Sequence, residues 1–503
     1  MAGKNTIIAR QTATGGAWMV AARLISRVID LTTMIVLAHL LLPKDFGLVA
    51  IAMTVIYIVE AALELPLSQA LVRLPTTEQT HYDTAFTLGL IRGLLLALVV
   101  CGVSWPFSRF YSDARLFPLV CMLSLAPASR GLVSPKLADF ARVFDFTPDF
   151  IMELVSKLAA FSAAILLALA TRSYWAVAAG TLVAPIVSTC TSYILAPYRP
   201  RLSLIKLSAF SGFLGWITAA QIVSSINWQA DRLLLGKLTS RTELGLFTTA
   251  NDAANIPLQA FLSPLMRPLL SAYSTLREFP ERIAGSYQSS AQAIVALGLP
   301  ILVGEALIAP AGVRLLLGDK WAGSATILRW LAISLVPTLF AAPLGPLVMA
   351  FGRTHIFLQR NFFELCIKLP LVVLGAIKYG FIGILIARGI SEVATVVYCM
   401  VLVRRLIGVP VLQQVIAPWR SIVSTCVMAS VVSLLLPWLN HFTSTALLAE
   451  GHVLTVTLAV ITYASSLFAL WAAVGCPSGL EAMVAEHVMT LVKPRIKAAH
   501  VYE

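Results

Sequence analysis

Residues 82–105 read YDTAFTLGLIRGLLLALVVCGVSW, an apolar run whose charged residues are Asp83 and Arg92. A helix needs roughly 20 predominantly apolar residues to cross a hydrocarbon core about 30 Å thick. Helices are one of the two backbone forms that satisfy their own hydrogen bonds inside a bilayer. This stretch therefore predicts a membrane-spanning helix.

Apolar stretches of this kind follow one another along nearly the whole 503-residue chain. Hydrophobic residues make up 58% of the chain and charged residues 12%, whereas a typical soluble domain is about 25% charged. We therefore expect an all-α membrane protein with about fourteen transmembrane helices. The expected spans are 14–38, 45–65, 82–105, 114–132, 149–170, 173–196, 211–236, 243–266, 286–316, 324–350, 356–377, 380–403, 420–440 and 453–475.

The basic residues are unevenly distributed along this chain, whose formal net charge is +13. With the N-terminus placed in the cytoplasm, the 37 Lys and Arg divide into 20 in cytoplasmic connections, 9 in external ones and 8 within spans. This is the positive-inside bias of multi-pass membrane proteins. We therefore expect cytoplasmic termini, no cleavable signal peptide and no nucleic-acid partner; the surrounding partner is the lipid bilayer.

The sequence lacks the motifs of common catalytic and cofactor sites. Its seven cysteines are scattered, nearly all within spans, and none has CxxC spacing, so we expect neither disulfides nor a metal site. There is no phosphate-binding glycine loop, HExxH motif or nucleophile elbow. We therefore expect a protein that is not an enzyme and that uses no cofactor.

An internal repeat links the first two spans to the seventh and eighth. At an offset of 198 residues, Trp18 aligns with Trp216 and Gly47-Leu48 with Gly245-Leu246. Residues 18–71, which are 54 positions, share 14 identities with their counterparts. Such self-similarity at a fixed offset is typical of a duplicated structural unit.

The repeat predicts the arrangement of the spans. Six spans separate the copies, and an even number makes them parallel, related by a pseudo-twofold axis along the membrane normal. We expect two six-helix bundles, as in alternating-access transporters, followed by two extra transmembrane helices and a cytoplasmic amphipathic tail. The corresponding domains are 1–200, 201–405, 406–476 and 477–503.

Charged and polar residues within the spans mark the candidate site, because a charge in the bilayer usually faces a partner or a wet cavity. Arg23, Arg27 and Asp30 are spaced i, i+4 and i+7, which places them on one helix face. The two arginines repel each other, so an anionic ligand such as phosphate would explain their spacing. The candidate substrate-binding residues are Arg23, Arg27, Asp30, Arg92, Asn227, Asp231, Asn255, Arg360 and Arg388.

Acidic residues within the spans allow more than one interpretation. Glu60 and Glu64 could bind a coupling cation or pair with an arginine of another span. Candidate coupling-ion residues are Glu60, Glu64, Asp252 and Glu305. We expect intrahelical ion pairs, spaced i to i+4, for Glu153 with Lys157 and for Arg388 with Glu392.

The segment joining the first two spans, LAHLLLPKDFGLVA at 37–50, resembles bacterial polysaccharide-export flippases of the Wzx type. Gly15-Gly16-Ala17-Trp18 and LPLSQALVR at 65–73 resemble the same family. With fourteen spans and cytoplasmic termini, the likeness extends over nearly the whole chain. This family is the polysaccharide branch of the multidrug/oligosaccharidyl-lipid/polysaccharide flippase superfamily.

The resemblance implies a function in the bacterial inner membrane. Members of the family move undecaprenyl-pyrophosphate-linked oligosaccharide repeat units from the cytoplasmic to the periplasmic leaflet, for export of exopolysaccharide, O-antigen or capsule. Related flippases hold the pyrophosphate with cavity arginines, so the resemblance implies that role for Arg23 and Arg27. It also implies a polysaccharide polymerase and chain-length or export proteins as partners.

Two rival functions remain to be weighed. A cation-coupled multidrug antiporter of the same superfamily would need a net acidic cavity, which Asp30, Glu60 and Asp231 favour and the arginines oppose. A membrane-embedded polysaccharide polymerase would need a sizeable external loop, and the expected external connections are a handful of residues long. The sequence therefore favours a lipid-linked oligosaccharide flippase.

Overall fold

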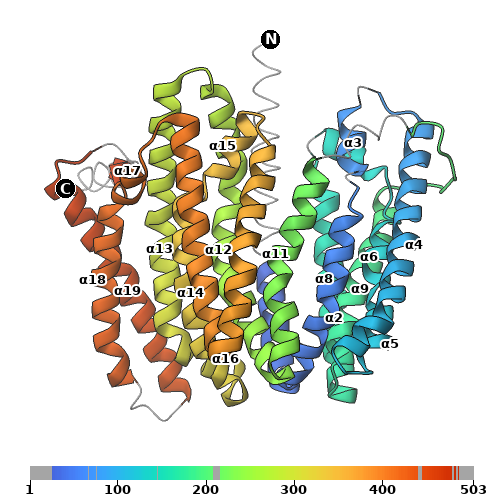
Figure 1. The fold of residues 1–503 in the computed structure, drawn as a ribbon, viewed down its shortest axis with the longest axis horizontal. Helices are drawn as coiled ribbons and strands as arrows, with labels where there is room; N and C mark the ends of the chain where they lie inside the picture. Colours follow the sequence, from blue (N-terminus) through green and yellow to red (C-terminus); the bar gives the residue numbers. More distant parts are fainter. Residues whose placement is uncertain are drawn as a thin grey trace, which may run out of the picture. The chain divides into compact units, whose positions relative to one another are not determined.

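The protein is helical throughout the parts that can be described. The structure, a computed structural model, describes residues 25–65, 67–74, 76–143, 145–207, 216–439, 445–477, 481–482 and 485–486. Within these ranges every regular element is a helix (Figure 1). The prediction of an all-α fold is confirmed there.

The first part of the chain contains a helix over 25–40 and eight labelled helices up to residue 195. Pro43 starts α2 at a first-turn position, where its missing N–H would have no helical partner. The helices are α2 (Pro43–Ala62), α3 (Leu67–Arg73), α4 (Gln79–Phe110), α5 (Leu116–Leu123), α6 (Leu125–Arg130), α7 (Leu137–Arg142), α8 (Thr147–Thr171) and α9 (Trp175–Leu195).

The remaining part repeats this pattern of long helices and short connections. Its elements are α11 (Trp216–Leu238), α12 (Arg241–Leu276), α13 (Pro280–Leu317), η1 (Asp319–Trp321), α14 (Ala322–Ala341), α15 (Leu344–Ala350), α16 (His355–Ile407), α17 (Val411–Ile416), α18 (Trp419–Leu439) and α19 (Thr445–Ala473). α16 contains two helices that meet at Gly380, whose φ of 59° interrupts the helical backbone.

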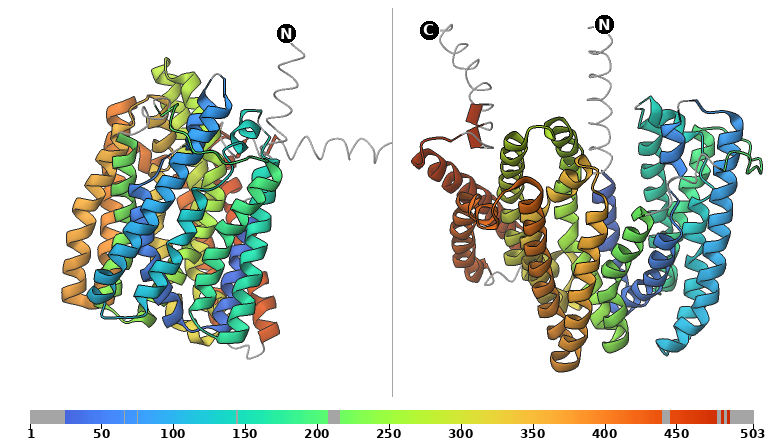
Figure 2. Two further views of the ribbon diagram at one scale, coloured as in Figure 1. Left: turned by 90° about the vertical axis from the view of Figure 1, so that its right-hand side faces the viewer. Right: turned by 45° about the horizontal axis from the view of Figure 1, so that its top comes forward.

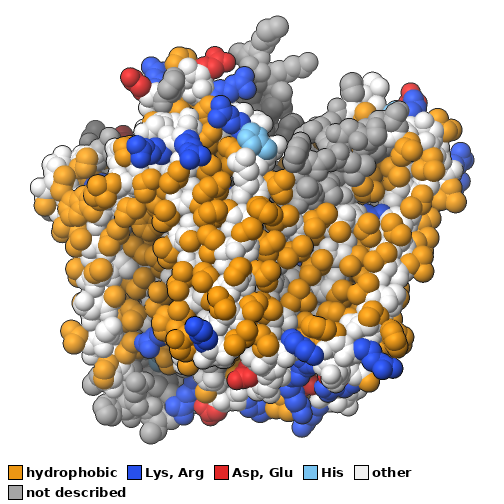
Figure 3. Space-filling view, viewed as in Figure 1, with side chains coloured by type: hydrophobic (Ala, Val, Ile, Leu, Met, Phe, Trp, Pro, Cys, Tyr) orange, Lys and Arg blue, Asp and Glu red, His pale blue; other side chains and the backbone are white. Residues whose placement is uncertain are grey.

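Nine helices of the described residues are long and apolar enough to cross a membrane. On the face shown in Figure 3, hydrophobic side chains form a broad band, while Lys and Arg lie mainly toward its margins. α11 and α12 are not among the nine, because polar residues lower their hydropathy. The protein is therefore a multi-pass membrane protein, and the count of fourteen spans stays a prediction.

The chain forms two compact units. The first comprises the described parts of Met1–Asp252 with Leu316–Ser324 and Thr354–Ala387, and the second comprises those of Ala253–Leu315, Ala325–Arg353 and Arg388–Glu503. In the first unit α8 packs along α9 and α11 along α2, and in the second α18 packs along α19 (Figure 2). These units follow contacts, whereas the predicted domains follow the repeat, so the predicted domains stay a prediction.

The segments that connect the helices of the first unit contact one another in two separate groups, called sets here. Trp321 donates its indole N–H to the Ala38 carbonyl at 2.9 Å, and Arg241 donates to the Tyr111 carbonyl at 3.0 Å. In the other set, Lys206 pairs with Glu78 at 3.2 Å and Arg142 donates to the Leu71 carbonyl at 2.7 Å. The sets contain alternate connections along the chain, as expected when successive helices run in opposite directions.

The two copies of the repeat touch each other symmetrically. A Cβ on Gly47 would lie 2.0 Å from the Arg241 carbonyl oxygen, and one on Gly245 would lie 1.8 Å from the Pro43 carbonyl oxygen. The offset of 198 residues relates Gly47 to Gly245 and Pro43 to Arg241. The same close approach is therefore made twice with the roles exchanged, as a local twofold axis requires.

Proline breaks the hydrogen-bond ladder of α13 in the second unit at two places. Pro300 and Pro310 have no N–H for the carbonyls of residues 296 and 306. Tyr463 of α19 donates its hydroxyl to the Ala296 carbonyl, and Arg329 of α14 donates to the Ala306 carbonyl at 3.3 Å. Neighbouring helices therefore satisfy both freed carbonyls, which keeps this kind of break tolerable inside a membrane.

Candidate functional site

The helix over 25–40 and α8 bring three charged side chains together within the first unit. The Asp30 carboxylate bonds to the Lys157 ammonium of α8, and Arg27 lies one turn away with its Nη1 3.9 Å from Asp30 Oδ2. The side chains remain partly exposed, at 40% for Arg27 and 31% for both Asp30 and Lys157. One carboxylate therefore serves two cations. Arg23, predicted on the same face, lies outside the described residues.

The expected intrahelical pair of Glu153 and Lys157 is wrong. Lys157 reaches across to Asp30 of another helix, and no ion pair of Glu153 occurs among the described residues. The i to i+4 spacing allows a surface pair on an isolated helix, but a neighbouring helix offers the ammonium a different carboxylate. Sequence reasoning missed Lys157 as a site residue because it does not show which helices adjoin.

A second charged group lies where α2, α4 and α6 meet. Arg130 of α6 donates to Glu60 of α2, with 2.7 Å between Nη1 and Oε1. For Glu60 the sequence left two alternatives, a coupling cation or an arginine of another span, and the structure shows the arginine. Arg92 of α4 donates its Nε to the Leu63 carbonyl at 2.8 Å, while Glu64, just beyond α2, is exposed.

Asp252, another candidate for a coupling ion, is paired within the first unit. Arg232 of α11 donates to it, with 2.9 Å between Nη2 and Oδ1. The Ser225 hydroxyl of α11 donates to the Tyr57 carbonyl of α2 at 3.1 Å, so polar groups of α2 and α11 also meet.

A third group fastens α11 to the first half of α16. Lys368 Nζ lies 2.9 Å from Asp231 Oδ2, and these side chains are 5% and 4% exposed. Lys368 also donates to the Asn227 carbonyl, while the Asn227 amide donates to the Asn361 carbonyl at 2.7 Å. The spacing of Arg360, Glu364 and Lys368 predicts one charged stripe along the helix. In the structure these residues have different partners: Arg360 pairs with Glu364 at 3.7 Å, whereas Lys368 pairs with Asp231.

The first and third groups share a pattern between the two copies of the repeat. In each copy an aspartate on the first helix bonds to a lysine on the fifth: Asp30 to Lys157, and Asp231 to Lys368. The offset of 198 places Asp231 opposite Thr33, one helical turn from Asp30. The two bridges therefore join equivalent helices, and one is partly open while the other is sealed.

The second unit holds the remaining candidates. Glu305 of α13 has a buried Oε2 atom for which the described residues supply no hydrogen bond. Asn255 of α12 and Arg388 of α16 are half-buried and take part in further interactions.

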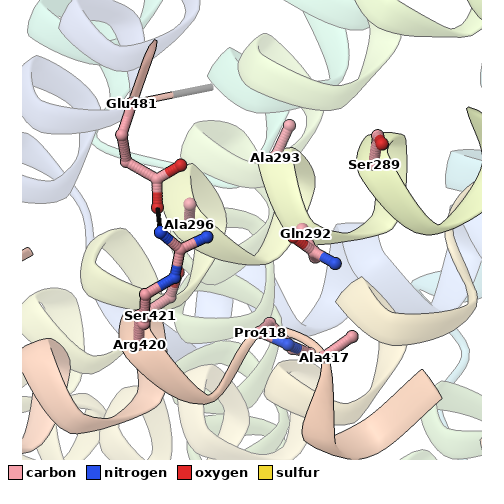
Figure 4. A pocket seen from close by; sticks show the side chains of 9 residues that line it. All are labelled: Ser289, Gln292, Ala293, Ala296, Ala417, Pro418, Arg420, Ser421 and Glu481. Carbon is pink, nitrogen blue, oxygen red and sulfur yellow. Dashed lines mark ion pairs between the residues drawn. The ribbon is translucent and has the colours of Figure 1, made fainter. Parts of the chain in front are cut away.

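A small pocket in the second unit contains none of the predicted residues. α13 supplies Ser289 and Gln292, and the start of α18 supplies Arg420 (Figure 4). Arg420 Nη1 lies 3.3 Å from Glu481 Oε1, and Figure 4 shows the two side chains pointing toward each other. Glu481 therefore holds the start of the tail against α18. Of the amphipathic tail expected at 477–503, residues 478–480, 483–484 and 487–503 lie outside the described part.

Three basic side chains of these groups are candidates for contact with an anionic ligand. Arg27 and Lys157 both lie beside Asp30. Arg92 is held by a backbone carbonyl next to the Glu60–Arg130 pair. Cations within a span need an opposite charge or water, and a phosphate group would supply the opposite charge.

Comparisons with known proteins relate the chain to polysaccharide biosynthesis. A family model described as polysaccharide biosynthesis protein matches residues 36–326, more than half of the chain. The lipopolysaccharide biosynthesis protein WzxC of Escherichia coli K12 is 21% identical over 422 residues, covering 81% of this chain and 84% of the relative. The succinoglycan biosynthesis transport protein ExoT of Rhizobium meliloti is 24% identical over 472 residues, covering 92% and 95%.

Solved structures show a similar fold. The lipid II flippase MurJ in an inward closed conformation has a TM-score of 0.72 at 14% identity, covering 90% of this chain and 98% of that one. An inward-facing multidrug resistance MATE family transporter of the MOP superfamily has a TM-score of 0.56 at 16% identity, covering 77% and 98%. The chain therefore has the fold of the MOP-superfamily transporters.

Proposed function

Because this chain belongs to the family of polysaccharide biosynthesis proteins, we propose that it is a flippase for lipid-linked oligosaccharides. The relatives named for lipopolysaccharide and succinoglycan biosynthesis match most of the chain and most of their own length. The lipid II flippase shares the fold. The printed names of the succinoglycan relative and of the lipid II flippase describe transport, which supports a carrier of sugar-bearing lipid.

The observation that carries this proposal is the placement of basic side chains within the helices of the first unit. Arg27 and Lys157 share one carboxylate, and Arg92 is bonded to a backbone carbonyl. A diphosphate joining lipid to sugar is an anion that the hydrocarbon core excludes. Guanidinium and ammonium groups offset its charge and donate strong hydrogen bonds to its oxygens.

The proposed transport works by alternating access. The lipid tail stays in the bilayer, while the diphosphate and oligosaccharide pass along the polar side chains of the helices. Fourteen spans in two parallel six-helix bundles, with two extra C-terminal helices, would supply the symmetric parts that such a motion needs. The symmetric contact of Gly47 and Gly245 supports this arrangement.

The proposed setting is the bacterial inner membrane, with cytoplasmic termini and movement from the cytoplasmic to the periplasmic leaflet. The proposed substrate is an undecaprenyl-pyrophosphate-linked repeat unit, with a polymerase and chain-length or export proteins acting next. The names of the relatives support this class of substrate. The excess of Lys and Arg in the connections placed inside supports the orientation.

The energy source belongs to the proposal as well. Of the four carboxylates considered for a coupling ion, Glu60 and Asp252 are already bonded to arginines, and Glu64 is exposed. Glu305 remains as a carboxyl within a span, with a buried oxygen that the described residues leave without a hydrogen bond. Of the four, we therefore propose Glu305 as the residue that binds a proton or a coupling cation.

The multidrug antiporter remains the second candidate, because a MATE family transporter shares the fold. In the first unit, however, Asp30, Asp231 and Asp252 are each bonded to a basic side chain. Carboxylates occupied in this way do not offer a cationic drug a free counter-charge. The geometry therefore favours the flippase.

A deletion strain tests the proposed function. Loss of surface polysaccharide, with complete lipid-linked repeat units stranded on the cytoplasmic leaflet, is the expected result. Repeat units accumulating on the periplasmic leaflet would indicate a polymerase instead. Unchanged polysaccharide together with raised sensitivity to cationic drugs would indicate the antiporter.

A further inference from the structure

The two equivalent Asp–Lys bridges of the first unit differ in accessibility. The Asp231 and Lys368 side chains are 4% and 5% exposed and lie among the Asn227 and Asn361 groups. The Asp30 and Lys157 side chains are both 31% exposed. Helices in equivalent places therefore carry the same pair of charges in two different environments.

The open bridge also has one cation more than the sealed one. Arg27 lies 3.9 Å from Asp30 and is 40% exposed. The residue three positions before Asp231 is Trp228, and the residue that the offset of 198 pairs with Arg27 is Ser225, so neither position carries a charge. At the open bridge, one carboxylate thus serves two basic groups, and all three side chains are partly exposed.

A charged cluster within a span is stable where water or an opposite charge reaches it. Exchange of one anion for another at such a cluster leaves both cations with an anionic partner throughout. A diphosphate has more oxygens than a carboxylate and a charge on each phosphate, so it can contact both cations together.

We propose that Asp30 is a resident counter-anion that substrate diphosphate displaces, and that Lys157 is a diphosphate-binding residue beside Arg27. This inference rests on the proposed function and adds a lysine of α8 to the site. In the empty state Asp30 holds Arg27 and Lys157 close together. When substrate enters, its phosphates take these two cations, and Asp30 binds them again as the substrate leaves.

The sealed bridge has a different role in this scheme. Lys368 is bonded to both Asp231 and the Asn227 carbonyl and is almost fully buried. Moving its ammonium to an incoming phosphate would leave a buried carboxylate without a partner, which is strongly unfavourable. Asp231 and Lys368 therefore fasten α11 to α16 and take no part in diphosphate binding.

Two substitutions with opposite expected effects test the proposal. The full-length protein is purified in nanodiscs, and binding of geranylgeranyl diphosphate is measured by titration. Lys157→Gln removes a ligand and should weaken binding by about tenfold, whereas Asp30→Asn removes the competing anion and should strengthen it about fivefold. Lys368→Gln is the matched control, and its affinity should stay within about twofold of the wild type, whatever its thermal stability.

A purely structural ion pair would behave differently. Asp30→Asn and Lys157→Gln would then lower thermal stability alike and leave the affinity unchanged, or shift it in the same direction. Either result would overturn the proposal.

A transport measurement on the same samples separates this inference from the proposed function. If affinities diverge as expected but the wild-type protein moves no lipid-linked oligosaccharide, the diphosphate site stands and the flippase proposal fails. If the wild type moves the substrate while neither variant alters affinity, the flippase proposal stands and the role of Asp30 and Lys157 fails.

Discussion

Asp113, in the connection between α4 and α5, forms a charge cluster outside the spans. Arg115 donates to both of its carboxylate oxygens, at 3.0 and 2.9 Å, and Arg241 lies 3.6 Å away. Burial acts to raise the pKa of Asp113, but the bonds and charges of these two arginines outweigh it and lower the pKa below its usual 3.8. The ionised carboxylate therefore stabilises the folded state.

Asp113→Asn should lower the free energy of unfolding by about 1–2 kcal/mol at neutral pH. A lowered pKa means that this stabilisation is fully present above pH 3.8 and is lost as the pH falls through the folded-state pKa. Thermal unfolding in detergent should thus show a gap between wild type and variant at pH 7 that closes toward pH 3. Glu278→Gln, at a residue that is 76% exposed, is the control, and a gap that widened toward acid would contradict the assignment.

The sealed Asp231–Lys368 bridge should be a structural fastener. Lys368→Met alone leaves a buried carboxylate without its cation and should cost about 3–5 kcal/mol of stability. Lys368→Met combined with Asp231→Leu should recover most of this loss, because no buried charge remains. Unfolding midpoints of the three proteins check this expectation; a double variant no more stable than the single one would refute it.

Arg27 should be essential for export while contributing little to folding. Arg27→Ala should reduce surface polysaccharide by about tenfold or more, since it removes a charge-assisted contact to the substrate. Membrane expression should stay near the wild-type level. Arg277→Ala, at a side chain that is 58% exposed, should export normally; equal export by the Arg27 variant would exclude the residue from the site.

The sequence identifies charged residues within spans but not their partners. The spacing of Arg27 and Asp30 on one face is confirmed by their separation of 3.9 Å. Lys157 is misassigned to its own helix, because i to i+4 spacing is visible in sequence whereas the packing of α8 against the helix over 25–40 is not. Ion pairs between helices depend on that packing, so they require the structure.

At the level of single elements, glycines set how closely helices approach. Gly89 and Gly93 of α4 lie against α6, where a Cβ would come within 2.3 Å of the Gly131 carbonyl and 2.7 Å of the Ala128 carbonyl. This GxxxG spacing places both glycines on one helix face, where the missing side chains allow the close approach. Gly375 and Gly383 do the same for the two halves of α16.

Gly245→Ala should disturb the contact between the two repeat copies. The added Cβ would lie 1.8 Å from the Pro43 carbonyl oxygen, a backbone atom that moves only if α2 moves. Overpacking of this kind costs about 1–3 kcal/mol. Gly285→Ala in α13 has no neighbour within 4 Å and is the control; unfolding midpoints of both variants equal to the wild type would show that the contact is not tight.

Two of the predicted spans are each interrupted by a helix break. A proline, visible in the sequence, accompanies each break. The span expected at 114–132 divides into α5 and α6, and the one at 324–350 divides into α14 and α15. Each break lies about one turn before a proline, because Pro127 and Pro346 have no N–H for the carbonyls of residues 123 and 342. Apolar content alone does not register such breaks.

At the scale of the whole molecule, the repeat is the most informative sequence feature. The offset of 198 residues predicts parallel copies, and the reciprocal contacts of Gly47 and Gly245 agree with a local twofold axis. The paired Asp–Lys bridges extend the correspondence to the fifth helix of each copy, where ELVSKL at 153–158 recurs as ELCIKL at 364–369, at an offset of 211 residues. Their different exposure is invisible in sequence, because it depends on what packs around each pair.

Transport by the purified protein tests the flippase directly. The chain is reconstituted into liposomes with a labelled diphosphate-linked oligosaccharide lipid, and a membrane-impermeant reagent reports the fraction of label on the outer leaflet. Wild-type protein should equilibrate the label between leaflets, whereas Arg27→Ala should leave it close to the protein-free rate. Wild-type protein that moves no label, or an Arg27 variant as fast as the wild type, would contradict this account of the molecule.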